Sequence, residues 1–154
     1  MTTPRYFEDY PKGAQYDLGT IAVEEDEVLG FARRFDPQPI HVDSTFAAQG
    51  PHGGVIASGW HTAALMMRLY ATRFLSPASS VASPGIESLR GTPPVRPGDQ
   101  LTVLVTIEEA VGSRSKPERG ILTTQIEVRN QDDVAVLSMR AVNIILRRPA
   151  GDAA

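Results

Sequence analysis

The feature that most constrains the fold is an apolar helix followed by a run of long strands. Residues 60–75 (WHTAALMMRLYATRFL) are rich in good helix formers, and Ser58 stands where an N-cap is expected. Apolar residues cover most of the circumference of this helix, which is typical of a buried helix. Alternating apolar and polar residues then predict strands at residues 100–110, 121–129 and 134–146. Such separation of helix and strands indicates an α+β fold, with an antiparallel sheet packed on one helix.

The N-terminal part of the chain is predicted to add a strand and an amphipathic helix. The strand covers residues 15–23. The helix follows, with an apolar face formed by Val28, Phe31, Ala32 and Phe35, and Pro37 ends it. Two short elements complete the prediction, a helical turn at residues 43–49 and a strand at residues 85–90.

The length of 154 residues fits a single domain over residues 1–154, with peripheral tails at residues 1–12 and 147–154. A net charge of −3 does not suggest a nucleic-acid partner, and the absence of cysteine excludes disulfides, cysteine-ligated zinc and thiol nucleophiles. No apolar run approaches the roughly 18 residues that a membrane span requires, and the start of the chain does not resemble a signal peptide. We therefore expect a cytoplasmic protein that does not interact with membranes.

Asp36 and His41 are the candidate catalytic residues. They lie in the segment 35–43 (FDPQPIHVD), where Pro37 and Pro39 restrict the loop and hence the relative positions of the two side chains. A carboxylate and an imidazole held together can act on one water molecule, as general acid–base catalysis requires. The same residues could instead form a turn cap and a local hydrogen bond, because this spacing alone is a weak signal.

The surrounding motifs resemble the MaoC-like dehydratase family, which includes the (R)-specific enoyl-CoA hydratases. The first motif is Asp-x-x-Pro-Ile-His-x-Asp at residues 36–43, followed by GGVIASG at residues 53–59 and the apolar helix. A second motif, PVRPGD at residues 94–99, precedes a long strand. The matching stretches run from about residue 26 to residue 146. The resemblance implies a hot-dog fold, in which an antiparallel sheet wraps around a central buried helix.

The resemblance also implies a reaction and a set of site residues. Asp36 and His41 would share a water that attacks C3 of a trans-2-enoyl thioester, and they would deliver a proton to C2. Gly59, at the start of the apolar helix, would supply backbone N–H groups to the thioester oxygen. Coenzyme A would enter as part of the substrate, with no separate cofactor and no metal. The protein would form a homodimer or a higher homo-oligomer, with the two sheets joined into one, which removes exposed strand edges.

Two departures from the family pattern concern the segment around the aspartate and the loop before the helix. The residues commonly found one before and two after the aspartate are glycine and asparagine, whereas this chain has Phe35 and Gln38. The loop before the helix often reads His-Gly, whereas this chain has Ser58-Gly59. These departures concern the pocket and therefore the acyl group. The candidate substrate-binding residues are Gln38, Ser58, Trp60, Arg96, Arg114 and Lys116, the basic ones as contacts for coenzyme A phosphates or as parts of a solvated loop.

The sequence also allows two other hypotheses about the function. A hot-dog thioesterase would hydrolyse the same kind of substrate, although such enzymes tend to carry a different acidic motif. A non-catalytic acyl-binding module would not need the Asp36–His41 pair. Ser58 does not lie in a nucleophile elbow, and His41-x-Asp43 lacks further metal ligands. We expect His52 in a loop, His61 on a helix surface, and Met66 and Met67 in the core.

Overall fold

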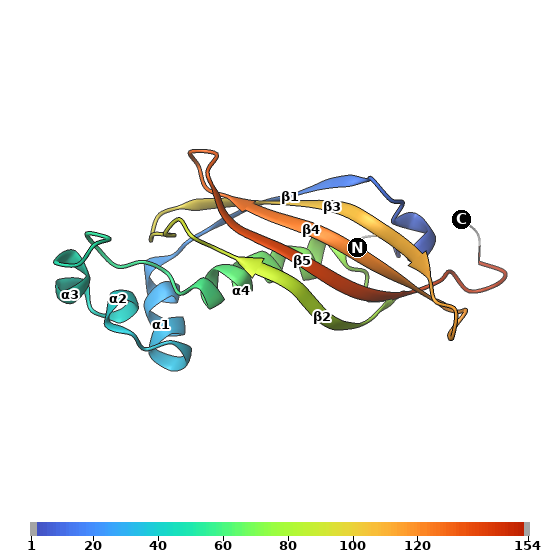
Figure 1. Ribbon diagram of the computed structural model, residues 1–154, viewed down its shortest axis with the longest axis horizontal. Coiled ribbons are helices and arrows are strands. Elements are labelled where there is room, and N and C mark those ends of the chain that lie inside the picture. The colour runs from blue at the N-terminus through green and yellow to red at the C-terminus, as the bar shows by residue number, and fades with distance from the viewer. Residues whose placement is uncertain (1–2, 153–154) are drawn as a thin grey trace.

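A five-stranded antiparallel sheet is the largest element of the computed structural model, which describes residues 3–152 (Figure 1). The strand order is β1-β3-β4-β5-β2. The strands are β1 (Gln15–Ala22), β2 (Ser80–Arg90), β3 (Gln100–Gly112), β4 (Arg119–Arg129) and β5 (Ala135–Leu146). The helices are η1 (Phe7–Asp9), α1 (Glu25–Phe35), α2 (Pro39–Val42), α3 (Ser44–Ala48), α4 (Gly59–Leu69) and η2 (Tyr70–Phe74), of which η1 is a 3-10 helix and η2 a π-helix.

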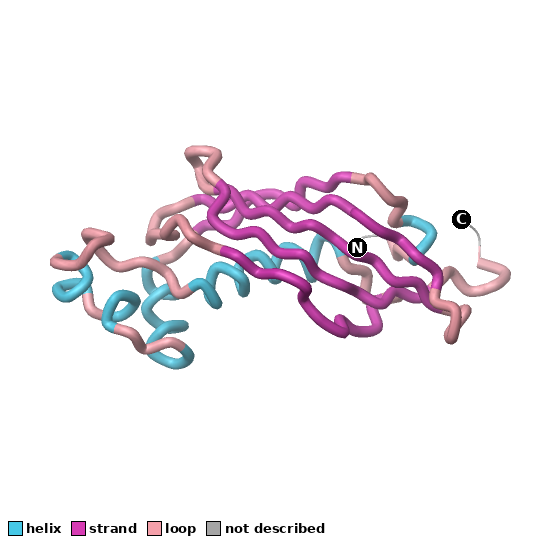
Figure 2. Tube along the Cα trace, in the orientation of Figure 1, coloured by secondary structure: helices cyan, strands magenta, loops and turns pink. Residues whose placement is uncertain are grey.

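The core lies between the inner face of the sheet and helix α4, which runs along the sheet behind it in Figures 1 and 2. On β3, buried residues alternate with half-buried ones, as the sequence predicts for a strand with one face in the core. Each fully buried aliphatic side chain contributes about 1.5–3 kcal/mol to folding. The α+β prediction is therefore confirmed, and the sheet wraps around one helix as in the hot-dog fold.

Helix α4 is buried on one face only. Its buried residues include Leu65, Met66 and Leu69, whereas Trp60 and Met67 are 65% and 44% exposed. The prediction that Met66 fills the core is confirmed, and the same prediction for Met67 is wrong for the single chain. The reason is that the sheet covers one side of α4 and no other element of the described chain covers the side that carries Trp60 and Met67.

His61 lies in the interior, so the prediction of a helix-surface position is wrong. Its side chain is buried because α1 packs across α4 at this turn, and its ring stacks on that of Phe31 with centroids 5.0 Å apart. The Nδ1 atom of His61 is buried and has no hydrogen-bond partner among residues 3–152. The ring stack therefore packs α1 against α4 but leaves the hydrogen-bonding capacity of Nδ1 unsatisfied.

We expect the protein to lose stability as the pH falls below about 6.5, the ordinary pKa of histidine. Burial lowers the pKa of His61, and the neighbouring Glu27 opposes this shift only in part. The unfolded chain therefore takes up this proton at a higher pH than the folded chain, which reduces the free energy of unfolding. The loss from this group ends once the pH lies below the pKa of His61 in the folded state.

Thermal unfolding of wild type and of a His61→Phe variant across this pH range measures the effect. Phenylalanine keeps a flat ring against Phe31 and cannot take up a proton. The variant should lose less stability than wild type between about pH 7 and about pH 5. Equal losses in the two proteins would show that His61 does not titrate as described.

Strand β2 is longer than predicted. The sequence indicates a short strand at residues 85–90, and the structure has an 11-residue strand that starts at Ser80. All 11 residues are exposed in the single chain. The strand therefore has no buried face, and its sequence lacks the alternation of apolar and polar residues that a buried face produces. Pro84 lies within it and interrupts the usual strand signal, because proline has no N–H to donate and is tolerated on an edge strand. β2 is thus an unprotected edge of the sheet.

The segment before β1 is predicted to be peripheral, and the structure corrects this. Tyr10 is fully buried, and its hydroxyl donates a hydrogen bond to the carbonyl oxygen of Phe74 at 2.7 Å. The guanidinium of Arg5 lies over the Tyr10 ring. At the other end of the chain, Arg148 forms an ion pair with Asp9. The outermost residues of the two predicted tails, 1–2 and 153–154, lie outside the described residues.

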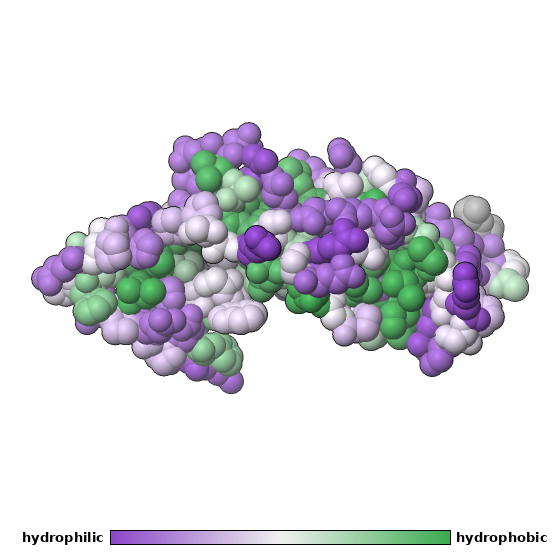
Figure 3. Space-filling model, viewed as in Figure 1, coloured by the Kyte–Doolittle hydropathy of each residue, from purple (hydrophilic) through white to green (hydrophobic). Residues whose placement is uncertain are grey.

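The outer face of the sheet is mostly polar in its middle, with an apolar area nearer the turn between β3 and β4 (Figure 3). Arg140 forms ion pairs with Glu87 and Glu108 across this face. Val111 and Ile121, which are paired between β3 and β4, are both exposed there. No helix within residues 3–152 is long and apolar enough to cross a membrane.

Candidate active site

Three helix ends bring the candidate catalytic residues together. Helix α1 ends at Phe35, and Asp36 follows as its C-cap residue, with its backbone N–H donating to Ala32. His41 lies on the one-turn helix α2, so the predicted stiff loop is in fact helical; proline at its first position suits a helix start. Opposite them lies the start of α4, with Ser58 as N-cap and Gly59 as first residue.

The carboxylate of Asp36 accepts hydrogen bonds on both oxygens. Gln38 Nε2 donates to Oδ1 at 2.7 Å, and Ser58 Oγ donates to Oδ2 at 2.7 Å. These bonds, that from Gln38 first, hold the pKa of Asp36 below its usual value. The site therefore presents an ionised carboxylate with a fixed orientation.

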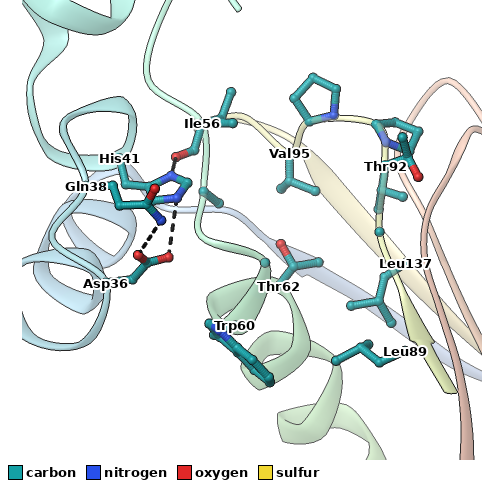
Figure 4. Close-up of a pocket in the computed structure, with 16 residues that line it drawn as sticks. Asp36, Gln38, His41, Ile56, Trp60, Thr62, Leu89, Thr92, Val95 and Leu137 are labelled. Carbon is teal, nitrogen blue, oxygen red and sulfur yellow. Dashed lines mark hydrogen bonds and ion pairs between the residues drawn. The ribbon is translucent and has the colours of Figure 1, made fainter. Parts of the chain in front are cut away.

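His41 is buried and is held in one tautomer. Its Nδ1 atom lies 2.7 Å from the carbonyl oxygen of Ile56. A carbonyl can only accept, so Nδ1 carries the proton, and in the neutral ring Nε2 presents its lone pair. Nε2 lies 3.3 Å from Asp36 Oδ2 (Figure 4). The site thus offers two adjacent acceptors, which can hold both hydrogens of one water molecule.

A pocket of about 330 Å³ adjoins this pair. The Asp36–His41 pair and the start of α4 form one wall, and strands β2 and β5 with the loop before β3 form the other (Figure 4). Most of the lining is apolar, with side chains from Ile56, Trp60, Leu89, Val95 and Leu137. A chain of methylene groups would therefore find apolar surface beside a polar reacting centre.

Gly59 lines the pocket at the N-terminus of α4. Its N–H has no acceptor within the helix because it is the first residue. A Cβ added at Gly59 would meet no atom within 4 Å, so the backbone is open to the pocket there. The helix dipole adds partial positive charge at this point. The position can stabilise negative charge on an oxygen atom of a ligand.

The predicted substrate-binding residues fall into two groups. Gln38 and Trp60 line the pocket, and Arg96 follows the lining residue Val95, beside Gly54 of the glycine-rich loop. Ser58 is fully buried and does not line the pocket; its hydroxyl is bonded to Asp36 and accepts the N–H of Trp60. In the structure the Ser58 side chain therefore contacts Asp36, and its predicted contact with substrate stays a prediction.

Arg114 and Lys116 lie far from the pocket of their own chain. Both are on the turn between β3 and β4, at the end of the sheet opposite the α1–α3 helices (Figure 1). Neither residue lines the pocket of its own chain, and their contact with substrate stays a prediction. His52 lies in a loop, as predicted.

Several lining residues have no signal in the sequence. Ile56 fixes the tautomer of His41 through a backbone carbonyl, which any residue would offer. Leu89 lies on the edge strand, and Leu137 reaches the pocket from β5. Within residues 3–152, no group of three or more His, Cys, Asp or Glu side chains is placed to hold a metal ion.

Comparison with known proteins places these observations in a family context. The family model described as "MaoC like domain" matches residues 9–130. The chain is 28% identical over 141 residues to the uncharacterized protein YdeM of Bacillus subtilis, covering 92% of this chain and 98% of that protein. It is 35% identical over 112 residues to a 3-hydroxybutyryl-CoA dehydratase of Methylorubrum extorquens, covering 72% of this chain and 69% of that protein.

Solved structures of MaoC-like dehydratases and (R)-hydratases are also similar to this chain. A MaoC-like dehydratase from Rhodospirillum rubrum superposes with a TM-score of 0.85 at 37% identity, over 94% of this chain and 99% of that one. The (R)-hydratase from A. caviae involved in PHA biosynthesis superposes with a TM-score of 0.73 at 25% identity, over 92% and 99%. The hot-dog prediction is thereby confirmed.

Proposed function

The chain belongs to the MaoC-like dehydratase family, and from this premise we propose that it adds water to a trans-2-enoyl-CoA to give a 3-hydroxyacyl-CoA, or catalyses the reverse dehydration. The observation that carries the proposal is the placement of Asp36 Oδ2 3.3 Å from His41 Nε2 beside an apolar pocket. The 3-hydroxybutyryl-CoA dehydratase relative supports the reaction class and makes crotonyl-CoA the first substrate to test.

The proposed hydration needs one water and one proton transfer in each direction. The water donates one hydrogen bond to His41 Nε2 and one to Asp36 Oδ2, which orients its oxygen toward C3 of the enoyl group. As the oxygen–C3 bond forms, the pair accepts one proton, and the C2–C3 π electrons move toward the thioester oxygen. The pair then returns the proton to C2, so H and OH have added and the side chains are restored.

Gly59 stabilises the negative charge that develops on the thioester oxygen in this reaction. Its N–H and the dipole of α4 are fixed before the substrate arrives, so they need no reorganisation. Removal of one such donor typically costs about 10²–10³-fold in rate. Coenzyme A enters only as part of the substrate, and the proposed steps need no metal, so a chelator should leave the rate unchanged.

A thioesterase would use the same pocket but would give a different product. Hydration removes the enoyl double bond and leaves the thioester intact, whereas thioester hydrolysis releases free coenzyme A. A panel of enoyl-CoAs of increasing chain length, assayed for both products, therefore tests the proposal. A non-catalytic acyl-binding module would bind members of the panel and change none of them.

The exposed edge strand β2 supports assembly as a homodimer. Antiparallel pairing of β2 with the same strand of a second copy would join the two sheets and satisfy the free backbone groups at both edges. Ile86 and Leu89 point to the inner face of the sheet, because their partners on β5 are core residues, and both are exposed. Together with the uncovered Trp60 and Met67 of α4, they give this edge an apolar surface suited to a second copy.

A lysine at position 86 should dissociate the dimer. Ile86 is 54% exposed in the single chain and would be buried against the partner, so Ile86→Lys would bury two like charges near the two-fold axis. We expect self-association to weaken about 100-fold or more. Sedimentation across a concentration series measures this. Val134→Lys alters an apolar residue that is 42% exposed at the turn before β5, and it should leave the dimer intact; a monomeric wild type would contradict the assembly.

A further inference from the structure

The turn between β3 and β4 carries two exposed cations that have no side-chain partner among the described residues. Arg114 and Lys116 are both exposed, and neither side chain forms a hydrogen bond or ion pair among residues 3–152. Their basic neighbours are engaged: Arg119 pairs with Glu118, and Arg147 pairs with Glu8. The turn therefore carries two positive charges that are not neutralised by ion pairs among residues 3–152.

The pocket and this turn lie at opposite ends of β2. Gly120 pairs with Ile145, which pairs with Ser80, so the turn stands beside the start of β2. Leu89 and Gly91 line the pocket at the other end. At about 3.3 Å per residue, the 11 residues of β2 separate the two ends by roughly 30 Å. The side chains of the turn therefore lie too far away to contact a ligand group at the pocket of their own chain.

Two-fold antiparallel pairing along β2 would bring the turn of one copy to the pocket end of the other copy. When two identical strands pair antiparallel, the start of one lies beside the end of the other. The start of the partner's β2, with the partner's β3–β4 turn on the same end of its sheet, would then lie at the pocket end of this chain. The pocket is also open on that side, since its exposed lining residues Trp60 and Leu89 border the β2 edge.

We propose that Arg114 and Lys116 of one copy bind the phosphate groups of the coenzyme A whose acyl group occupies the pocket of the other copy. Phosphates are recognised by arginine in a bidentate manner and by lysine as a point charge, and unpaired side chains lose no intramolecular partner on binding. The inference rests on the proposed function and on the β2 dimer. It gives a role to two exposed cations at the end of the sheet remote from the reacting residues of their own chain.

Binding of coenzyme A alone tests this inference without relying on turnover. Trp60 is the single tryptophan and lines the pocket, so its fluorescence can report ligand binding. An Arg114→Ala/Lys116→Ala variant should bind coenzyme A about tenfold more weakly and should bind pantetheine, which has no phosphate, as wild type does. Lys12→Ala, which removes a cation near the same end of the sheet, is the control and should bind both normally. Unchanged affinity of the double variant for coenzyme A would overturn the inference.

Mixed dimers distinguish a turn that acts across the interface from one that acts in its own chain. Asp36→Asn chains have intact turns, and Arg114→Ala/Lys116→Ala chains have intact reacting residues. A mixed dimer contains one site with both, provided that the turn comes from the partner. Mixing should then restore a population of sites with wild-type KM for enoyl-CoA. If the turn serves its own chain, every active site in the mixture keeps the raised KM, and the cross-subunit assignment fails. A wild type that binds coenzyme A but hydrates no enoyl-CoA would overturn the proposed function and leave the binding result standing.

Discussion

Replacement of Asp36 by asparagine should lower kcat by about 10²–10⁴-fold, the usual contribution of a general acid–base group. Asparagine keeps the shape of the side chain and removes the charge, so it can no longer take up or return a proton beside His41. Asp36 lies at the end of α1 and is not part of the core, so the fold and the Tm should change little. Steady-state hydration kinetics and thermal unfolding of the same preparation separate the two effects.

Replacement of His41 should lower kcat as replacement of Asp36 does, but it should also lower the stability of the fold. His41→Ala should also lower kcat by about 10²–10⁴-fold. Because it leaves the buried carbonyl of Ile56 without its donor, it should in addition cost about 1–3 kcal/mol of stability. The Asp36→Asn/His41→Ala double variant should be little slower than the slower single variant, since the two groups handle one water. Fully multiplicative losses would show that they act independently.

Substitution of Ser58 by alanine should reduce kcat/KM by about 10- to 100-fold, although the serine does not line the pocket. A hydrogen bond to a charged group contributes about 1.5–3 kcal/mol, and Ser58 donates such a bond to Asp36 Oδ2 at 2.7 Å. Its loss raises the pKa of Asp36 toward the usual value, because that bond is one of the causes of the lowering. The acid limb of the pH–rate profile should therefore move to higher pH.

The pH profile separates this role from a purely structural one. Ser58 also caps α4, so Ser58→Ala should cost about 1 kcal/mol of stability through the cap alone. Asp43→Ala is the matched control, since Asp43 caps α3 by accepting from Phe46 and makes no bond to Asp36. It should lose similar stability without moving the acid limb. Ser58→Thr retains the hydroxyl and should restore the profile; an unmoved acid limb in Ser58→Ala would contradict the positioning role.

The elements with one face in the core could be predicted from the sequence. On β3 the burial alternates from Leu101 to Ile107, so every second residue marks the inner face there. The start of α4 could be placed from Ser58, whose capping role is local. The proximity of Asp36 and His41 could also be predicted, because only four residues lie between them and family-like motifs surround them. In each case the information lies within a few residues of the feature.

The elements that depend on distant parts of the chain could not be predicted. His61 is buried by Phe31 of α1, and no local pattern reveals that α1 crosses α4 at that turn. Tyr10 is buried by Phe74, which is far along the chain. β2 has no buried face in one chain, so it lacks the alternation that marks other strands. The distance of Arg114 from the pocket follows from sheet topology, which residue type does not show.

The most direct test of the proposed reaction is a single assay of the wild-type protein with crotonyl-CoA and longer enoyl-CoAs. Enoyl absorbance and free thiol are followed together in the same sample. We predict that the absorbance falls for at least one chain length without release of thiol, and that Asp36→Asn removes this change. Release of thiol at the rate of substrate loss, or unchanged absorbance with every member of the panel, would contradict the account.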